Sequence, residues 1–153
     1  MAGVIVCCVD SSSEARDAAR VACGLATRLG FELVLLHVAP SPIQPGLSAA
    51  TFGQERLAES EREDASALLD QLASDLGCAV DKVERRVEFG DPAERVLAVC
   101  EQEHAEMVVL GSRRHGNVKA ALLGSVSTDV AGKAPCIVVI VPPGAAEQTS
   151  LLA

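Results

Sequence analysis

The chain has 153 residues, which is enough for one domain with a sizeable core. Apolar residues make up 49% of it, which excludes a disordered chain, and aromatic residues make up only 2%. A formal net charge of −8 and the scarcity of stacking rings argue against a nucleic-acid partner. No segment is long and apolar enough to span a membrane, and the N-terminal residues lack the basic start of a signal peptide. We therefore expect a cytoplasmic protein with no membrane partner.

Cysteine and histidine give no sign of a metal site or of a disulfide. Most of the cysteines lie inside apolar runs, as small buried residues often do. None forms a C-x-x-C pair, and the cytoplasm disfavours disulfides, so we expect Cys23, Cys78 and Cys100 to serve in core packing. The three histidines have no metal-ligand spacing. The cysteines are Cys7, Cys8, Cys23, Cys78, Cys100 and Cys136.

The first predicted elements are a strand and a helix. The apolar run Val4–Val9 predicts a strand that is covered on both faces. Asp10 follows this strand directly, and apolar residues then recur at helical spacing over residues 15–29. Ser11 and Glu14 have the spacing of a capping box for this helix. Asp10 could belong to the same cap, or its carboxylate could accept hydrogen bonds from a ribose or an adenine.

Two more strands flank the second helix. Glu32–Val38 is mostly apolar, with Leu33–Leu36 as its centre, and predicts another covered strand. Prolines, glycines and small polar residues between Pro40 and Gly53 predict a long mobile loop, and residues 65–76 have helical periodicity. Val83–Phe89 alternates apolar and charged residues, which predicts a strand at the edge of the sheet.

The remaining elements repeat the alternation of helix and strand. Asp91 can cap a third helix, Pro92 has the φ that a first helical turn needs, and Glu94 can reach back to the cap. Apolar residues at 107–110 predict the fourth strand, and a fourth helix is expected from Ser125 to Pro135. Cys136–Val141 is the last predicted strand, and residues 142–153 are expected to be a disordered tail.

This order of elements predicts an α/β fold. We expect residues 1–141 to form a single doubly wound domain, with an open, five-stranded, mainly parallel sheet of order 3-2-1-4-5 and helices on both faces. Ligands bind such sheets at the carboxyl ends of the strands, where the winding reverses. Asp10 and Gly111 lie at that place if the first and fourth strands are neighbours.

The most informative segment joins the fourth strand to the fourth helix. Gly111 ends the strand, and Gly124 with Ser125 opens the helix, which leaves free N–H groups and a positive helix end beside a loop. Gly111 alone could be an ordinary turn glycine. The Ser125 hydroxyl could cap the helix, or it could turn with the N–H groups of Val126 and Ser127 toward phosphate oxygens. The presence of both glycines on one loop favours the interpretation that this segment binds a ligand.

The side chains between these glycines leave both a binding and a surface interpretation open. Arg113 and Arg114 could clamp phosphates, and His115 could touch one, although each could equally be a solvated surface residue. No Walker lysine pattern and no nucleophile elbow is present. We therefore expect no enzyme, or at most a slow ATPase in which Asp10 orients water.

Taken together, these residues resemble the universal stress protein family over nearly the whole chain, from Val4 to about Val141. ATP-binding members of that family carry the pattern G-x-x-G-(nine residues)-G-[ST]. Gly111 fits its first position, and Gly124 and Ser125 fit its last two, but Arg114 stands at the middle glycine. Its guanidinium could block the phosphate site or pair with the phosphate. The other matching pieces are Val9-Asp10-Ser11-Ser12, His37-Val38, Gly111-Ser112-Arg113, Leu122-Leu123-Gly124-Ser125-Val126-Ser127 and Ala134-Pro135-Cys136.

The resemblance implies a ligand and a partner. The ligand is ATP or AMP, with Mg²⁺ as an accompanying ion, and the partner is a second copy of the chain joined through strand 136–141. Independently, an uncovered apolar edge strand tends to pair with another chain. The implied nucleotide contacts are Asp10, Val38, Gly111, Ser112, Arg113, Arg114, His115, Gly116, Asn117, Gly124, Ser125, Val126 and Ser127.

Two main functional hypotheses follow. In the first, the chain is a cytoplasmic stress-response protein that binds an adenine nucleotide as a regulatory ligand. In the second, which Arg114 motivates, it is a dimeric interaction module of the same family that binds no nucleotide.

Overall fold

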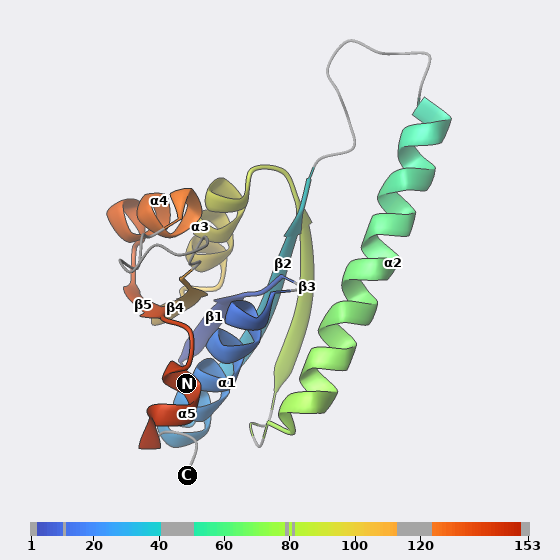
Figure 1. The fold of residues 1–153 in the computed structure, drawn as a ribbon. Coiled ribbons are helices and arrows are strands. Elements are labelled where there is room, and N and C mark those ends of the chain that lie inside the picture. Colours follow the sequence, from blue (N-terminus) through green and yellow to red (C-terminus); the bar gives the residue numbers. More distant parts are fainter. Residues whose placement is uncertain are drawn as a thin grey trace, which may run out of the picture.

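The computed structural model describes residues 3–10, 12–40, 51–78, 80, 82–112 and 124–150. Five strands form one sheet in the order β3-β2-β1-β4-β5, and every neighbouring pair is parallel. Helices lie on both faces of the sheet (Figure 1), so the predicted doubly wound α/β fold and its strand order are confirmed. The elements are β1 (Val4–Cys8), α1 (Ser13–Leu29), β2 (Glu32–Ala39), α2 (Thr51–Leu76), β3 (Val83–Phe89), α3 (Pro92–Gln102), β4 (Met107–Gly111), α4 (Ser125–Lys133), β5 (Ile137–Val141) and α5 (Ala145–Gln148).

The sheet separates two apolar cores. On one face, Ile5 and Cys7 of β1 pack with the buried alanines of α1 and with buried residues of α2 and α5. On the other face, Val6 packs with buried residues of α3 and α4, and Cys8 lies against this second core. Cys7 and Cys8 therefore point to opposite faces, as the alternation of a strand requires.

The helix caps agree only partly with the prediction. Asp91 caps α3 by accepting the Glu94 N–H at 3.0 Å, with Pro92 in the first turn, as predicted. At α1 the capping residue is Ser12, whose Oγ accepts the Ala15 N–H at 3.1 Å. The prediction that Ser11 begins the cap is therefore wrong by one residue, because Asp10 turns the chain before the helix starts.

The second helix is longer than its periodicity suggests. α2 begins at Thr51, so residues 51–53 are helical rather than part of the predicted loop. Residues 41–50 of the predicted loop lie outside the described residues. Buried Ala65, Leu69 and Leu72 attach the second half of α2 to the first core, whereas Leu57 in its first half is 57% exposed.

The two edges of the sheet differ in chemistry. The predicted edge strand β3 carries Arg86, which donates to Glu88 at 3.1 Å and to Glu103, the C-cap residue of α3, at 2.8 Å. The opposite edge is β5, where Ile137 is 60% exposed and the next three residues are half-buried valines and isoleucine. Polar contacts thus occupy the β3 edge, while the β5 edge presents apolar side chains.

The expectation of a disordered tail is wrong for residues 142–150. Ala146 of α5 is buried against α1, and the Gly144 N–H donates to the Asp17 carboxylate at 3.2 Å. Arg28 donates to the Ser150 carbonyl oxygen at 2.8 Å. One small apolar residue and two polar contacts hold this segment against α1. The segment has no long apolar run, so its hydrophobicity did not predict that it is ordered.

The expectation that disulfides are disfavoured and that Cys23 and Cys78 only pack in the core is also wrong. Cys23 of α1 and Cys78, just beyond α2, form a disulfide with a Cα–Cα distance of 5.8 Å. The two residues are 55 positions apart, and sequence spacing cannot show that the fold brings them together. The other four cysteines take no part in a disulfide. In the part of the chain described, no helix has the length and apolar character needed to cross a membrane.

Candidate functional site

A pocket of about 310 Å³ lies at the carboxyl ends of the central strands. β1 and β4 are parallel neighbours, with Cys7 opposite Val109, so their tips are adjacent as predicted. Asp10 and Gly111 therefore line one crevice. The residues around the pocket are Cys8, Val9, Asp10, Ser12, Glu14, Ala15, Val38, Pro92, Leu110, Gly111, Gly124, Ser125, Val126 and Ser127.

Asp10 is held in place by the start of α1. Its Oδ1 accepts the Ser12 N–H at 2.8 Å, and Ser12 in turn caps the helix. The side chain is half-buried and borders the pocket. The two interpretations of Asp10 are thus compatible, because one oxygen orders the helix start while the residue also lines the crevice.

Gly111 is required by packing between β4 and α1. A β-carbon at this position would lie 2.7 Å from the Glu14 carbonyl oxygen and 3.0 Å from its carbonyl carbon. The glycine therefore makes room for the backbone of α1 rather than for a ligand or a tight turn. This close approach brings the first turn of α1, with Glu14, to the edge of the pocket.

The N-terminus of α4 faces the pocket without a side-chain cap. Gly124 occupies the cap position in an extended conformation and makes no side-chain hydrogen bond, and Ser125 is the first, exposed helical residue. The first backbone bond of the helix runs from the Thr128 N–H to the Gly124 carbonyl oxygen at 3.0 Å. The N–H groups of residues 125–127 therefore precede the helical ladder, at the positive end of the helix dipole.

The charged and apolar parts of the pocket are separate. Asp10 and Glu14 bring two carboxylates, and none of the described lining residues is Lys or Arg. Val38, Pro92 and Leu110 supply apolar wall, suited to a flat ring system. An anionic group would find its favourable partners at α4 rather than beside α1.

Most of the predicted contact residues that the structure describes surround this pocket. Asp10, Val38, Gly111, Gly124, Ser125, Val126 and Ser127 all line it. Ser112 is described but does not line it. Its N–H donates to the Val141 carbonyl oxygen at 3.0 Å, and its Oγ is buried with no hydrogen-bond partner in the described structure. The predicted contacts Arg113, Arg114, His115, Gly116 and Asn117 lie outside the described residues.

Sequence reasoning missed several lining residues. Cys8, Ser12, Glu14 and Pro92 also border the pocket. Cys8 and Pro92 could have been found from their places at the end of a strand and the start of a helix, which a parallel sheet brings to one edge. Glu14 carried no such signal, because its position depends on how closely α1 approaches Gly111.

The described residues offer no ready metal centre. Among them, no group of three or more His, Cys, Asp or Glu side chains could hold a metal ion. Burial raises the pKa of the Cys100 thiol to about 12, with a smaller contribution from Cys136 nearby. Burial also raises the pKa values of Cys7 and Cys136, so these thiols stay protonated and are poor metal ligands at neutral pH.

Comparison with known proteins gives the family. Residues 1–142 match the universal stress protein family. A Thermus aquaticus universal stress protein is 33% identical over 143 residues, which cover 90% of this chain and 96% of that protein. Among solved structures, the universal stress protein UspA from Lactobacillus plantarum has a TM-score of 0.78 at 22% identity and covers 91% of this chain and 97% of its own. A universal stress protein solved in complex with cAMP has a TM-score of 0.71 at 20% identity and covers 91% of this chain and 96% of its own. The chain belongs to the universal stress protein family.

Proposed function

We propose that the pocket binds an adenine nucleotide, ATP or AMP, as a regulatory ligand in a cytoplasmic stress response. The observation that carries this proposal is that the start of α4, which has no side-chain cap, lines the same pocket as Asp10. Free N–H groups at a helix start bind phosphate oxygens, and a carboxylate can accept hydrogen bonds from ribose hydroxyls or an adenine amino group. The related fold solved with cAMP supports the same ligand class.

The two carboxylates bear on how a polyphosphate would bind. Asp10 and Glu14 would repel additional phosphate charge. A Mg²⁺ ion carried in with ATP would offset this repulsion, since it takes oxygen ligands from phosphates, carboxylates and water. The nucleotide itself would have to supply most of those ligands. We therefore expect ATP affinity to depend on Mg²⁺ more strongly than AMP affinity.

Calorimetric titration of the purified protein with ATP and with AMP tests the proposal. Saturable heat, with a rise in the melting temperature on adding nucleotide, is the expected result. A folded protein that shows neither at millimolar nucleotide would contradict it. Arg114→Gly is an informative companion, because tighter binding would mean that the guanidinium obstructs the site and weaker binding that it holds phosphate.

We also propose that the protein is a homodimer joined through residues 136–141. The exposed, apolar β5 edge supports this arrangement. The second candidate function, a dimeric interaction module without nucleotide, is favoured by Arg114 at the middle glycine of the ATP pattern and by the two carboxylates. It predicts a melting temperature that nucleotide does not change.

A further inference from the structure

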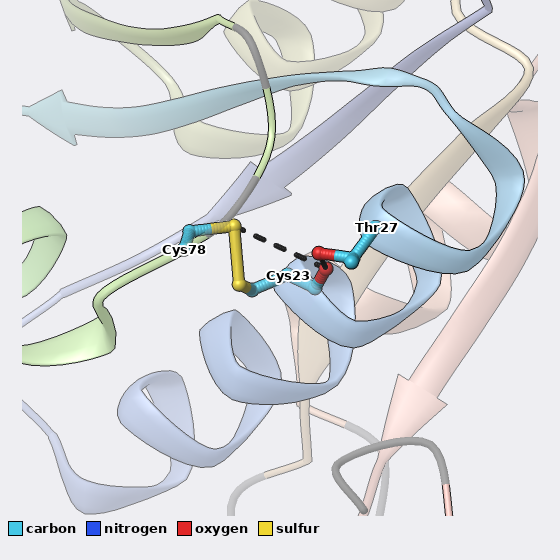
Figure 2. The surroundings of a disulfide bond; sticks show 3 residues. All are labelled: Cys23, Thr27 and Cys78. Carbon is cyan, nitrogen blue, oxygen red and sulfur yellow. Dashed lines mark hydrogen bonds between the residues drawn. A yellow bond between two sulfur atoms is a disulfide. The ribbon is translucent and has the colours of Figure 1, made fainter.

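The disulfide between Cys23 and Cys78 lies away from the candidate pocket. It joins the middle of α1 to Cys78, which lies two residues beyond the end of α2 at Leu76 (Figure 2). Neither cysteine lines the pocket at the strand tips. Both residues are only partly buried, so a small thiol or disulfide can reach them from solvent.

The bond secures the packed half of α2. That half meets the sheet through Ala65, Leu69 and Leu72, each at most 4% exposed. Two ion pairs add to the attachment, Arg85–Asp70 at 2.9 Å and Arg16–Asp75 at 3.5 Å, but all four side chains are well exposed and such pairs contribute little. The disulfide is the one covalent link described between α1 and the end of this helix.

The surroundings also accommodate the reduced state. The Cys23 carbonyl oxygen accepts a hydrogen bond from Thr27 Oγ1 at 2.8 Å, and Cys78 Sγ lies 4.0 Å from the same oxygen (Figure 2). Once reduced, the Cys78 thiol could donate a weak hydrogen bond to that oxygen. Opening the bridge therefore need not leave a buried polar group without a partner, and the apolar contacts of α2 remain.

We propose that Cys23 and Cys78 form a reversible thiol–disulfide exchange site whose reaction partner is a small disulfide of the glutathione class. One cysteine thiolate attacks glutathione disulfide, which gives a mixed disulfide and releases one glutathione thiolate that takes up the proton. The second thiolate then attacks the mixed disulfide, closes the Cys23–Cys78 bond and releases the second glutathione. Two protein thiols and one glutathione disulfide become one protein disulfide and two glutathiones.

The consequence of the exchange is local to α2. In the oxidised protein the end of the helix is covalently held to α1, whereas in the reduced protein only packing and exposed ion pairs hold it. The packed half of α2 should then open more often, while α3 on the other face of the sheet should not respond. This inference does not depend on whether the pocket binds a nucleotide.

The first test equilibrates the native protein in buffers with different ratios of glutathione to glutathione disulfide. Thiols are then trapped in acid, counted after unfolding, and mapped by peptide mass spectrometry. We expect six free thiols at the reducing end and four at the oxidising end, with residues 23 and 78 in one linked peptide. Approach from either end should give the same distribution.

Matched variants identify the pair. Cys23→Ser and Cys78→Ser should each abolish the linked peptide, whereas Cys136→Ser, which removes another partly buried cysteine, should leave it unchanged. The proposal is overturned if native protein exchanges in neither direction, or if the oxidised protein contains a different cysteine pair.

Hydrogen exchange provides the second test. Reduction of the wild-type protein should speed amide exchange in residues 65–76 by on the order of ten-fold, with residues 96–102 of α3 unchanged. Cys78→Ser should show the fast rate under both conditions. Equal protection of α2 in the oxidised and reduced protein would refute the proposed local release.

Discussion

Gly111 at the end of β4 lies directly against Glu14 in the first turn of α1, so closely that a β-carbon on the glycine would be 2.7 Å from the Glu14 carbonyl oxygen. The obstacle is backbone, which cannot rotate away as the end of a flexible side chain can. This contact fixes the distance between the central sheet and α1, which begins directly after Asp10 and Ser12. The geometry of the pocket therefore depends on a packing requirement.

Gly111→Ala should lower the free energy of unfolding by roughly 1–3 kcal/mol, because α1 or β4 must shift to admit the methyl group. The measurement is urea unfolding followed by circular dichroism. Gly132→Ala is the matched control. Gly132 lies within α4 with nothing within 4 Å of its added β-carbon, so alanine should raise the free energy by about 0.5–1 kcal/mol. Equal effects at the two positions would contradict the packing argument.

Gly124→Asp should weaken nucleotide binding while leaving the fold intact. A β-carbon at Gly124 meets nothing within 4 Å, and an aspartate there could cap α4, competing with phosphate for the same N–H groups. We expect an affinity loss on the order of ten-fold or more by calorimetry, with little change in the melting temperature. Ala131→Asp adds the same charge at an exposed position later in α4 and should retain wild-type affinity. If both variants bind equally well, the nucleotide does not use the start of α4.

If the proposed dimer forms through β5, Ile137→Lys should convert it to a monomer. The residue is 60% exposed at the start of the edge strand β5, where a charge on an intermolecular sheet would be desolvated. Light scattering after size-exclusion chromatography measures the mass directly. Leu57→Lys, at a residue that is 57% exposed on α2, is the control and should remain dimeric. A wild-type protein that is monomeric at high micromolar concentration would remove the basis for a β5 interface.

The buried thiol of Cys100 should reduce stability at alkaline pH. Its pKa in the folded protein is raised by burial from a usual value near 9 to about 12. The unfolded chain therefore loses this proton first, so the contribution to stability is complete below about pH 9 and is lost as the pH rises toward 12. The slope contributed is at most about 1.4 kcal/mol per pH unit.

Urea midpoints between pH 8 and 11 for the wild type and Cys100→Ala check this expectation. The variant should show a shallower decline, whatever its stability at pH 8. Parallel declines would mean that the thiol titrates alike in the folded and unfolded states.

The sequence was sufficient for the architecture, because that depends on patterns with a fixed period. A continuous apolar run such as Leu33–Leu36 indicates a strand that is covered on both faces, and the alternation of apolar and charged residues in Val83–Phe89 indicates an edge strand, as β3 is. Ligands bind parallel sheets of this kind at the carboxyl ends of the strands. This general observation correctly predicted that Asp10, Val38 and Gly124 line one pocket.

The features that could not be predicted from the sequence depend on contacts between distant segments. Predicting the Cys23–Cys78 bond requires knowing that α1 lies beside the α2–β3 connection. The place of Glu14 requires the approach of a helix to Gly111, and the docking of residues 142–150 depends on Ala146 and Asp17 rather than on a long apolar run. Capping at Ser12 rather than Ser11 reflects a one-residue ambiguity among adjacent serines.

The unlike chemistry of the two sheet edges limits how copies of this protein can assemble. Arg86 and its acidic partners make the β3 margin polar, with α2 packed beside it, so a further strand would have to displace charged contacts there. Only the β5 margin is apolar. If two copies join β5 to β5, each has used its apolar sheet edge, so assembly would stop at a closed pair and would not continue into a filament.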